Sequence, residues 1–181
     1  MLKDYPNLCL LPAIGDGSCL IHAILLSYNE EYINEKKTRR KEMAREIRDS
    51  LACLLPFVYS ELGRGYYKQV SESIPEYSLD AMIATLRSDE DLDYTFFEFI
   101  CDKLNKDLYI LDLKTGKPYI TKEEDLYQKG RDSIIIAFNG SHYDLIGLRN
   151  PETKGITTLF SPRHPLILKY RTAYQDDLRV S

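Results

Sequence analysis

Apolar residues in the first half of the chain recur every three or four positions, a spacing typical of helices with one buried face. The turn sequence Asp-Gly-Ser at 16–18 precedes the first such run, which predicts a helix over residues 19–32. A second helix is expected over residues 38–55, where Pro56 would stop it. A short helix over residues 79–86 follows. The N-terminal half is therefore predicted to be helical.

Further along, residues 95–98 (Thr-Phe-Phe-Glu) match a capping box and predict the start of another helix. After it the pattern changes from helices to short strands, which are expected over residues 108–113 and 133–138. The second of these strands meets a strand over residues 142–148 across Asn139-Gly140, a strong signal for a hairpin. The helix that begins at residues 95–98 is expected to bury Phe96, Phe97, Ile100 and Leu104.

The remaining segments carry weaker signals. A short strand is expected at 118–120, a closing loop at 161–165 and a last short strand at 166–170. No repeat, low-complexity tract or linker divides the chain, so residues 1–181 are expected to form one domain. Because helices come first and strands later, the predicted class is α+β, with N-terminal helices packed on a small antiparallel sheet.

Composition narrows the class of protein. Of the 181 residues, 44% are hydrophobic and 29% are charged, which is the balance of a soluble globular protein. The net charge of −4 argues against a general nucleic-acid binder, which carries a strong basic excess. No stretch reaches the roughly 18 apolar residues of a membrane span, and Pro12 breaks the first apolar run. Neither membrane association nor a signal peptide is therefore expected.

Cysteine spacing and one basic cluster refine this picture. The four cysteines are irregularly spaced and lack the Cys/His pattern of a zinc site, so no metal is expected. Reduced thiols suit a cytoplasmic or nuclear protein.

Residues 36–41 are strongly basic. One interpretation is a patch for nuclear localisation or nucleic-acid binding, and the other is the solvated start of a helix. The second interpretation is favoured.

Cys19 is a candidate nucleophile because it stands at the predicted start of a helix. Free backbone amides at a helix N-terminus favour a thiolate, and Gly17 allows a sharp turn before it. The amides of residues 16–19 could also face a developing oxyanion. The alternative is that Cys19 is only a small buried apolar residue.

The chain offers three histidines as a base for this thiol. His22 lies one turn along the same helix, and His164 lies in a Pro-flanked loop where it is expected to be exposed. His142 begins a predicted strand, with Asp144 two residues later on the same face. A carboxylate in this place can hold one imidazole nitrogen and leave the other to face a thiol. The alternative is a chance His-x-Asp sequence on a hairpin.

Two segments together resemble the ovarian-tumour (OTU) family of deubiquitinases. Residues 16–23, Asp-Gly-Ser-Cys-Leu-Ile-His-Ala, resemble its cysteine box. Residues 134–138 followed by 142–144, His-Tyr-Asp, resemble its histidine box about 120 residues later. Residues 95–111 resemble the helix and strand before that hairpin, so the likeness covers about residues 8–148. Departures are the absence of Trp and Ile21 in place of Phe, which bear on contacts to substrate.

The resemblance implies a papain-like cysteine protease of OTU type, possessing no cofactor, that hydrolyses ubiquitin isopeptide bonds. It implies that Cys19 is the nucleophile, His142 the general base and Asp144 the orienting acid. Asp16 is a second candidate acid that shapes the oxyanion loop formed with Gly17 and Ser18. A compact catalytic domain of this kind would suit a viral or bacterial protein acting in the host cytoplasm.

The implied partner is ubiquitin, polyubiquitin or a ubiquitin-like modifier. Tyr143 is expected beside the groove for the ubiquitin tail, although strand alternation also allows a core position. Residues 57–93 are expected to dock the globular part of ubiquitin, through tyrosines and the acids Glu72, Glu76, Asp89, Glu90 and Asp91. Two alternatives are open: a catalytically inactive ubiquitin-binding module, and a cysteine peptidase acting on ordinary peptides.

Overall fold

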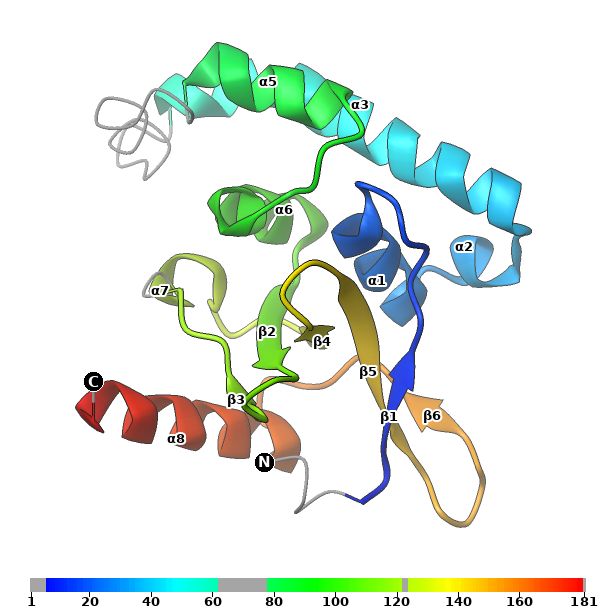
Figure 1. Cartoon of the computed structure of the whole chain (residues 1–181), viewed down its shortest axis with the longest axis vertical. Helices are drawn as coiled ribbons and strands as arrows, with labels where there is room; N and C mark the ends of the chain where they lie inside the picture. Colours follow the sequence, from blue (N-terminus) through cyan, green and yellow to red (C-terminus); the bar gives the residue numbers. More distant parts are fainter. Residues whose placement is uncertain (1–5, 62–77, 122–123, 181) are drawn as a thin grey trace.

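A six-stranded sheet forms the middle layer of the fold, with helices on both of its faces (Figure 1). The computed structural model describes residues 6–61, 78–121 and 124–180. The helices are α1 (Cys19–Tyr28), α2 (Glu30–Asn34), α3 (Lys37–Glu61), α5 (Leu79–Arg87), α6 (Phe97–Leu104), α7 (Glu124–Tyr127) and α8 (Pro165–Val180). α1 and α6 cover one face, α8 covers the other, and α3 and α5 pack together beyond α1 and α6. The α+β class is confirmed.

The sheet is mixed rather than antiparallel. Its strands are β1 (Leu8–Leu11), β2 (Asp107–Asp112), β3 (Lys117–Pro118), β4 (Ser133–Phe138), β5 (Tyr143–Arg149) and β6 (Ile156–Thr157). The order is β1-β5-β4-β2-β3, and β6 pairs with β5. β2 and β4 run parallel, whereas the other pairs are antiparallel. The prediction of a purely antiparallel sheet was wrong because the chain between β2 and β4 crosses over through β3 and α7.

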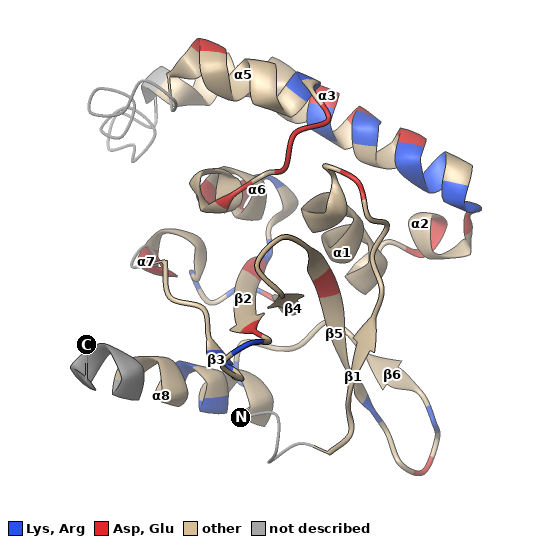
Figure 2. Ribbon diagram, in the orientation of Figure 1, with Lys and Arg blue, Asp and Glu red and all other residues tan. Residues whose placement is uncertain are grey.

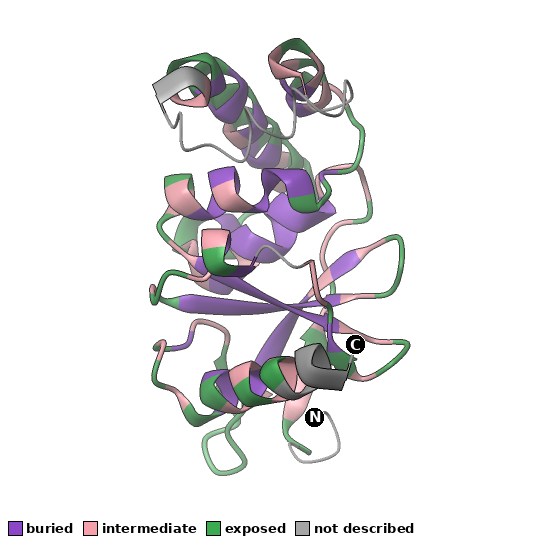
Figure 3. Ribbon diagram, turned by 90° about the vertical axis from the view of Figure 1, so that its left-hand side faces the viewer, coloured by how far each residue is buried: buried purple, intermediate pink, exposed green. Residues whose placement is uncertain are grey.

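Strand alternation divides the core into two parts, and the central strands β2 and β4 are buried along most of their length (Figure 3). Even-numbered residues of β2 and β4 pack toward α1 and α6, whereas odd-numbered residues pack toward α8. On the α8 side these residues meet Leu166, Ile167 and Tyr170. Because both faces are covered, the central strands are continuously apolar rather than alternating with polar residues.

Several predicted elements are confirmed with shifted ends. The helix over 79–86, the strands over 108–113 and 133–138 and the hairpin across Asn139-Gly140 are present. The predicted helix over 19–32 is two helices, because Asn29 is extended and its side chain accepts a hydrogen bond from the Tyr32 amide. β1, β6 and α7 were not predicted, and each is only two to four residues long.

Pro56 lies inside α3 and does not end it. A proline within a helix removes one backbone hydrogen bond and costs about 3 kcal/mol. Leu51 and Leu55 before it are buried, and Val58 after it packs against the same core. Tertiary packing on both sides of Pro56 therefore outweighs the local preference.

Two further expectations were wrong at helix starts. The capping group of the segment before α6 is Asp93, which accepts hydrogen bonds from the Thr95 amide and hydroxyl, so Thr95 is not the cap. Residues 166–170 are helical in α8, since their short apolar run fits a helix as well as a strand. His164 is half-buried, and its Nδ1 accepts the Leu166 amide at the start of α8.

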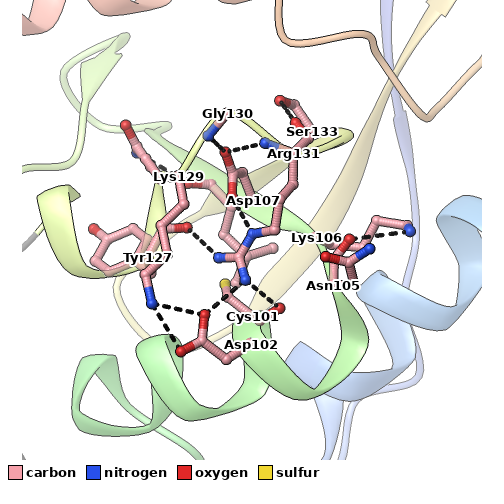
Figure 4. A network of polar contacts seen from close by, with 12 residues as sticks. Cys101, Asp102, Asn105, Lys106, Asp107, Tyr127, Lys129, Gly130, Arg131 and Ser133 are labelled. Atoms are coloured by element: carbon pink, nitrogen blue, oxygen red, sulfur yellow. Dashed lines mark hydrogen bonds and ion pairs between the residues drawn. The ribbon is translucent and has the colours of Figure 1, made fainter. Parts of the chain in front are cut away.

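An ionic network built on the buried Asp107 carboxylate holds the crossover between α6, β2 and β4 (Figure 4). The Asp107 carboxylate is fully buried and accepts hydrogen bonds from the Gly130 amide, the Arg131 amide and Arg131 Nε, at 2.7, 3.0 and 2.7 Å. Arg131 also reaches the Asp102 carboxylate at 2.6 Å, and Lys129 Nζ binds the same carboxylate at 2.8 Å. Asp107 thereby fixes where β4 begins beside β2.

Among the described residues, no helix is both long and apolar enough to cross a membrane.

Replacing Asp107 by Ala should lower the free energy of unfolding by about 3 kcal/mol, because the Gly130 amide, the Arg131 amide and Arg131 Nε would lose their shared acceptor. Urea denaturation of both proteins measures this difference. Asp125→Ala is the control: Asp125 is exposed on α7, and its loss should change stability by about 0.5 kcal/mol or less. Equal effects of the two substitutions would contradict the role of the network.

Candidate active site

Cys19 is the first residue of α1, and only 2% of its surface is exposed. α1 packs against β5, so the thiol lies beside the backbone of Tyr143, the residue after His142. Burial raises the pKa of the Cys19 thiol, a hydrogen bond from the Tyr143 backbone opposes this, and the charge of Asp91 adds to the rise. The candidate nucleophile therefore lies next to the predicted histidine segment.

His142 and Asp144 form the pair that their spacing predicts. His142 Nε2 lies 3.1 Å from Asp144 Oδ1, and both side chains are partly exposed. The same Asp144 oxygen accepts the Ala13 amide at 2.9 Å, which fixes the carboxylate. The Asn139 side chain accepts the amides of Ser141 and His142 and so shapes the turn before the histidine. Nδ1 of His142 forms no hydrogen bond with the described part of the chain, which leaves it able to receive a proton.

His22 has a different set of contacts and does not serve this pair. It is fully buried, with Nδ1 2.7 Å from the Tyr32 hydroxyl and Nε2 3.2 Å from Asp16 Oδ1. Burial lowers the pKa of His22, although the Asp16 carboxylate opposes this shift. Since the carboxylate can only accept, Nε2 donates to Asp16 and Nδ1 accepts from Tyr32. Both nitrogens are occupied, which favours the interpretation of His22 as a core helix residue.

Asp16 holds the loop before the cysteine. Its Oδ1 accepts the Ser18 amide at 2.9 Å, and its backbone carbonyl accepts the Cys19 amide at 3.0 Å. Burial acts to raise the pKa of Asp16, but the Ser18 amide and His22 hold it below its usual value. Lys41 Nζ lies 3.5 Å from the same carboxylate. Asp16 therefore supports the cysteine loop, which we define as residues 16–19.

Of the loop amides that could face an oxyanion, those of Asp16, Ser18 and Cys19 already have partners within the protein. The Asp16 amide donates to Ile14 O at 3.1 Å, and the Ser18 and Cys19 amides are bonded to Asp16. Gly17 N–H is the one amide of the loop without a partner in the described ranges. The Ser18 contact is an Asx-type bond to the amide two residues on, which an aspartate before Gly-Ser could have indicated from the sequence.

Gly17 is required by close packing. A Cβ at this position would lie 1.7 Å from the Asp89 carbonyl oxygen and 3.0 Å from the Glu90 carbonyl carbon. The segment 88–91, which the sequence marked only as acidic, therefore lies directly against the cysteine loop. Figure 2 shows this acidic segment beside the start of α1. No side chain larger than hydrogen fits between the two segments.

Tyr143 was expected beside the substrate groove, but its ring is in the core and only 8% exposed. It stacks on Phe138 with ring centroids 4.9 Å apart and meets Phe97 edge-on at 6.3 Å. Strand alternation explains this position, because Tyr143 points to the opposite face from His142 and Asp144. Its backbone, not its ring, contributes to the site.

The surfaces expected to meet a partner are described in part. Within 57–93, Glu72 and Glu76 lie outside the described residues, whereas Asp89, Glu90 and Asp91 are exposed. The basic cluster at 36–41 spans the start of α3, and much of its charge is paired within the protein (Figure 2). Arg39 binds Glu46 at 2.6 Å, and Arg40 donates to the Tyr32 and Ile33 carbonyls. These contacts favour a solvated helix start.

In the part of the chain that the structure describes, no group of three or more His, Cys, Asp or Glu side chains could hold a metal ion.

Comparisons with known proteins identify the fold. No protein-family model matches the chain, and no curated protein matches it significantly. An OTU domain in complex with ubiquitin is 21% identical, with a TM-score of 0.56 covering 92% of this chain and 81% of that one. The OTU domain of OTUD1 is 18% identical, with a TM-score of 0.52 covering 80% and 88%. The chain therefore has the fold of an ovarian-tumour (OTU) domain.

Proposed function

We propose that this protein is a deubiquitinase that hydrolyses ubiquitin isopeptide bonds through a thioester intermediate. The observation that carries the proposal is the His142–Asp144 pair at 3.1 Å, with the backbone of Tyr143 between them beside Cys19 at the start of α1. The OTU-domain fold supports the same conclusion, since one solved OTU domain of this fold is bound to ubiquitin. The proposed class is a cysteine-type protease acting in the cytoplasm.

In the proposed reaction, the Cys19 thiol attacks the carbonyl carbon at the ubiquitin C-terminus and gives its proton to His142 Nδ1. Asp144 holds Nε2, which keeps the ring in place and stabilises the imidazolium. His142 then protonates the departing lysine amine, which leaves a thioester on Cys19. Water attacks the thioester while His142 takes its proton, the C–S bond breaks, ubiquitin leaves with a free carboxylate, and the proton returns to the Cys19 thiolate. Gly17 N–H is the loop amide available to the oxyanion.

The proposed substrate is ubiquitin, polyubiquitin or a related modifier with a flexible, basic C-terminal tail. The exposed acids Asp89 and Asp91 lie in the segment against the cysteine loop, where they would meet positive charges of the tail. This charge complementarity would mainly raise the association rate and set the orientation of the tail. We place the docking of the globular part on residues 57–93.

A second candidate is a ubiquitin-binding module that does not turn over substrate. The deep burial of Cys19, which raises the pKa of its thiol, favours this alternative because a protonated thiol is a poor nucleophile. Reaction of Cys19 with an activated ubiquitin separates the two candidates.

Ubiquitin with a thiol-reactive group at its C-terminus should add once to the wild-type protein and not to Cys19→Ala, as measured by intact mass. Cys53→Ala is the matched control, because Cys53 is exposed on α3 and distant in sequence from the loop, and it should react as the wild type does. If the folded wild-type protein gained no ubiquitin, the deubiquitinase proposal would be wrong.

Asp144→Ala should lower kcat on a fluorogenic ubiquitin substrate by at least about 100-fold, because His142 would lose the group that orients it. Asp16→Asn keeps an oxygen for the Ser18 amide and should lose less than about tenfold. Steady-state rates on the same substrate give both values. A larger loss for Asp16→Asn than for Asp144→Ala would move the orienting role to Asp16.

A further inference from the structure

Arg48, in the middle of α3, is fully buried, and within the described residues its hydrogen-bond acceptors are all neutral oxygens. The guanidinium donates to Gly17 O at 2.6 Å and to Ser18 Oγ at 3.3 Å. Its other acceptors are the carbonyl oxygens of Thr85, Leu86 and Glu90, at 2.6, 3.0 and 2.9 Å. One side chain therefore joins α3, the end of α5, the segment 88–91 and the cysteine loop.

Packing alone does not account for an arginine at this position. Removing a guanidinium from water is costly, and an apolar side chain of similar volume is often neutral or stabilising in such places. Neutral carbonyl oxygens compensate the buried charge less fully than a carboxylate does. We therefore look for the role of Arg48 in the backbone segments that its hydrogen bonds fix, the cysteine loop and the segment 88–91.

The hydrogen bond from Arg48 to Gly17 O restrains a glycine, the residue type with the most flexible backbone. Glycine has the widest freedom of φ and ψ, so the chain just before Cys19 does not set its own conformation. Arg48 holds the oxygen of the Gly17–Ser18 peptide, and the Asp16 carboxylate holds its N–H at 2.9 Å. Because a peptide unit is planar, these two contacts fix the orientation of the whole plane.

We propose that Arg48 is a positioning residue for the hydrolysis, which holds the Gly17–Ser18 peptide so that Gly17 N–H and the Cys19 thiol stay in a reactive arrangement. This role rests on the proposed function. Arg48 acts through the loop backbone and does not touch the reacting atoms. It also ties Glu90 O to Gly17 O, so the acidic segment and the cysteine loop are held by one group.

The test is Arg48→Lys, which keeps the charge but loses the planar fork that reaches all these oxygens. Exchange of the Ser18 and Cys19 amide hydrogens, measured by NMR, should become at least about tenfold faster, while amides of β4 stay unchanged. On the fluorogenic ubiquitin substrate, kcat should fall at least about tenfold with KM within about twofold. Arg45→Lys is the matched control, because Arg45 contacts Asp89 from the exposed side of α3.

Each result decides the proposal. Unchanged exchange at Ser18 and Cys19 would overturn it, and this readout does not depend on turnover of ubiquitin. Equal acceleration at β4 would also overturn it, because Arg48 would then act on general stability. A rise in KM with kcat unchanged would assign Arg48 to substrate binding instead. If the wild type did not turn over ubiquitin, the proposed function would be wrong. The exchange rates of the Ser18 and Cys19 amides would still test whether Arg48 restrains the cysteine loop.

Discussion

The pairing of β1 with β5 is the contact on which the candidate site depends. It places Leu11 opposite Leu145, so the chain leaves β1 beside the histidine hairpin and enters the cysteine loop there. The Asp144 carboxylate continues this contact by accepting the Ala13 amide while it holds His142. Asp144 Oδ1 thereby connects the segment before the cysteine loop with the histidine hairpin. Without this pairing, the start of α1 would have no fixed place relative to His142.

The cysteine loop is held from several directions at once. Asp16 binds the Ser18 amide, His22 and Lys41 bind Asp16, and Gly17 packs directly on the segment 88–91. The same packing that restrains the loop also buries the Cys19 thiol, and this burial raises the pKa of the thiol. The contacts that position the cysteine loop are therefore also the contacts that bury the thiol.

The fold was predictable where the signals are local. Asn139-Gly140 with apolar runs on both sides predicted the hairpin, because turn type and strand period act within a few residues. The helix over 166–170 was missed because a five-residue run with four apolar residues does not distinguish the two periods. Pro56 was misinterpreted because its effect depends on packing around α3. The parallel pairing of β2 with β4 depends on a crossover that no local pattern records.

The sequence by itself determined the parts of the site whose geometry is local. Cys19 at a helix start and His142 with Asp144 on one strand face follow from backbone periods that act over a few residues. Only the tertiary structure decided that Tyr143 is a core residue and that Arg48 binds Gly17 O. The reason is that these contacts join segments brought together by the sheet and by α3, and burial is a property of the assembled layers.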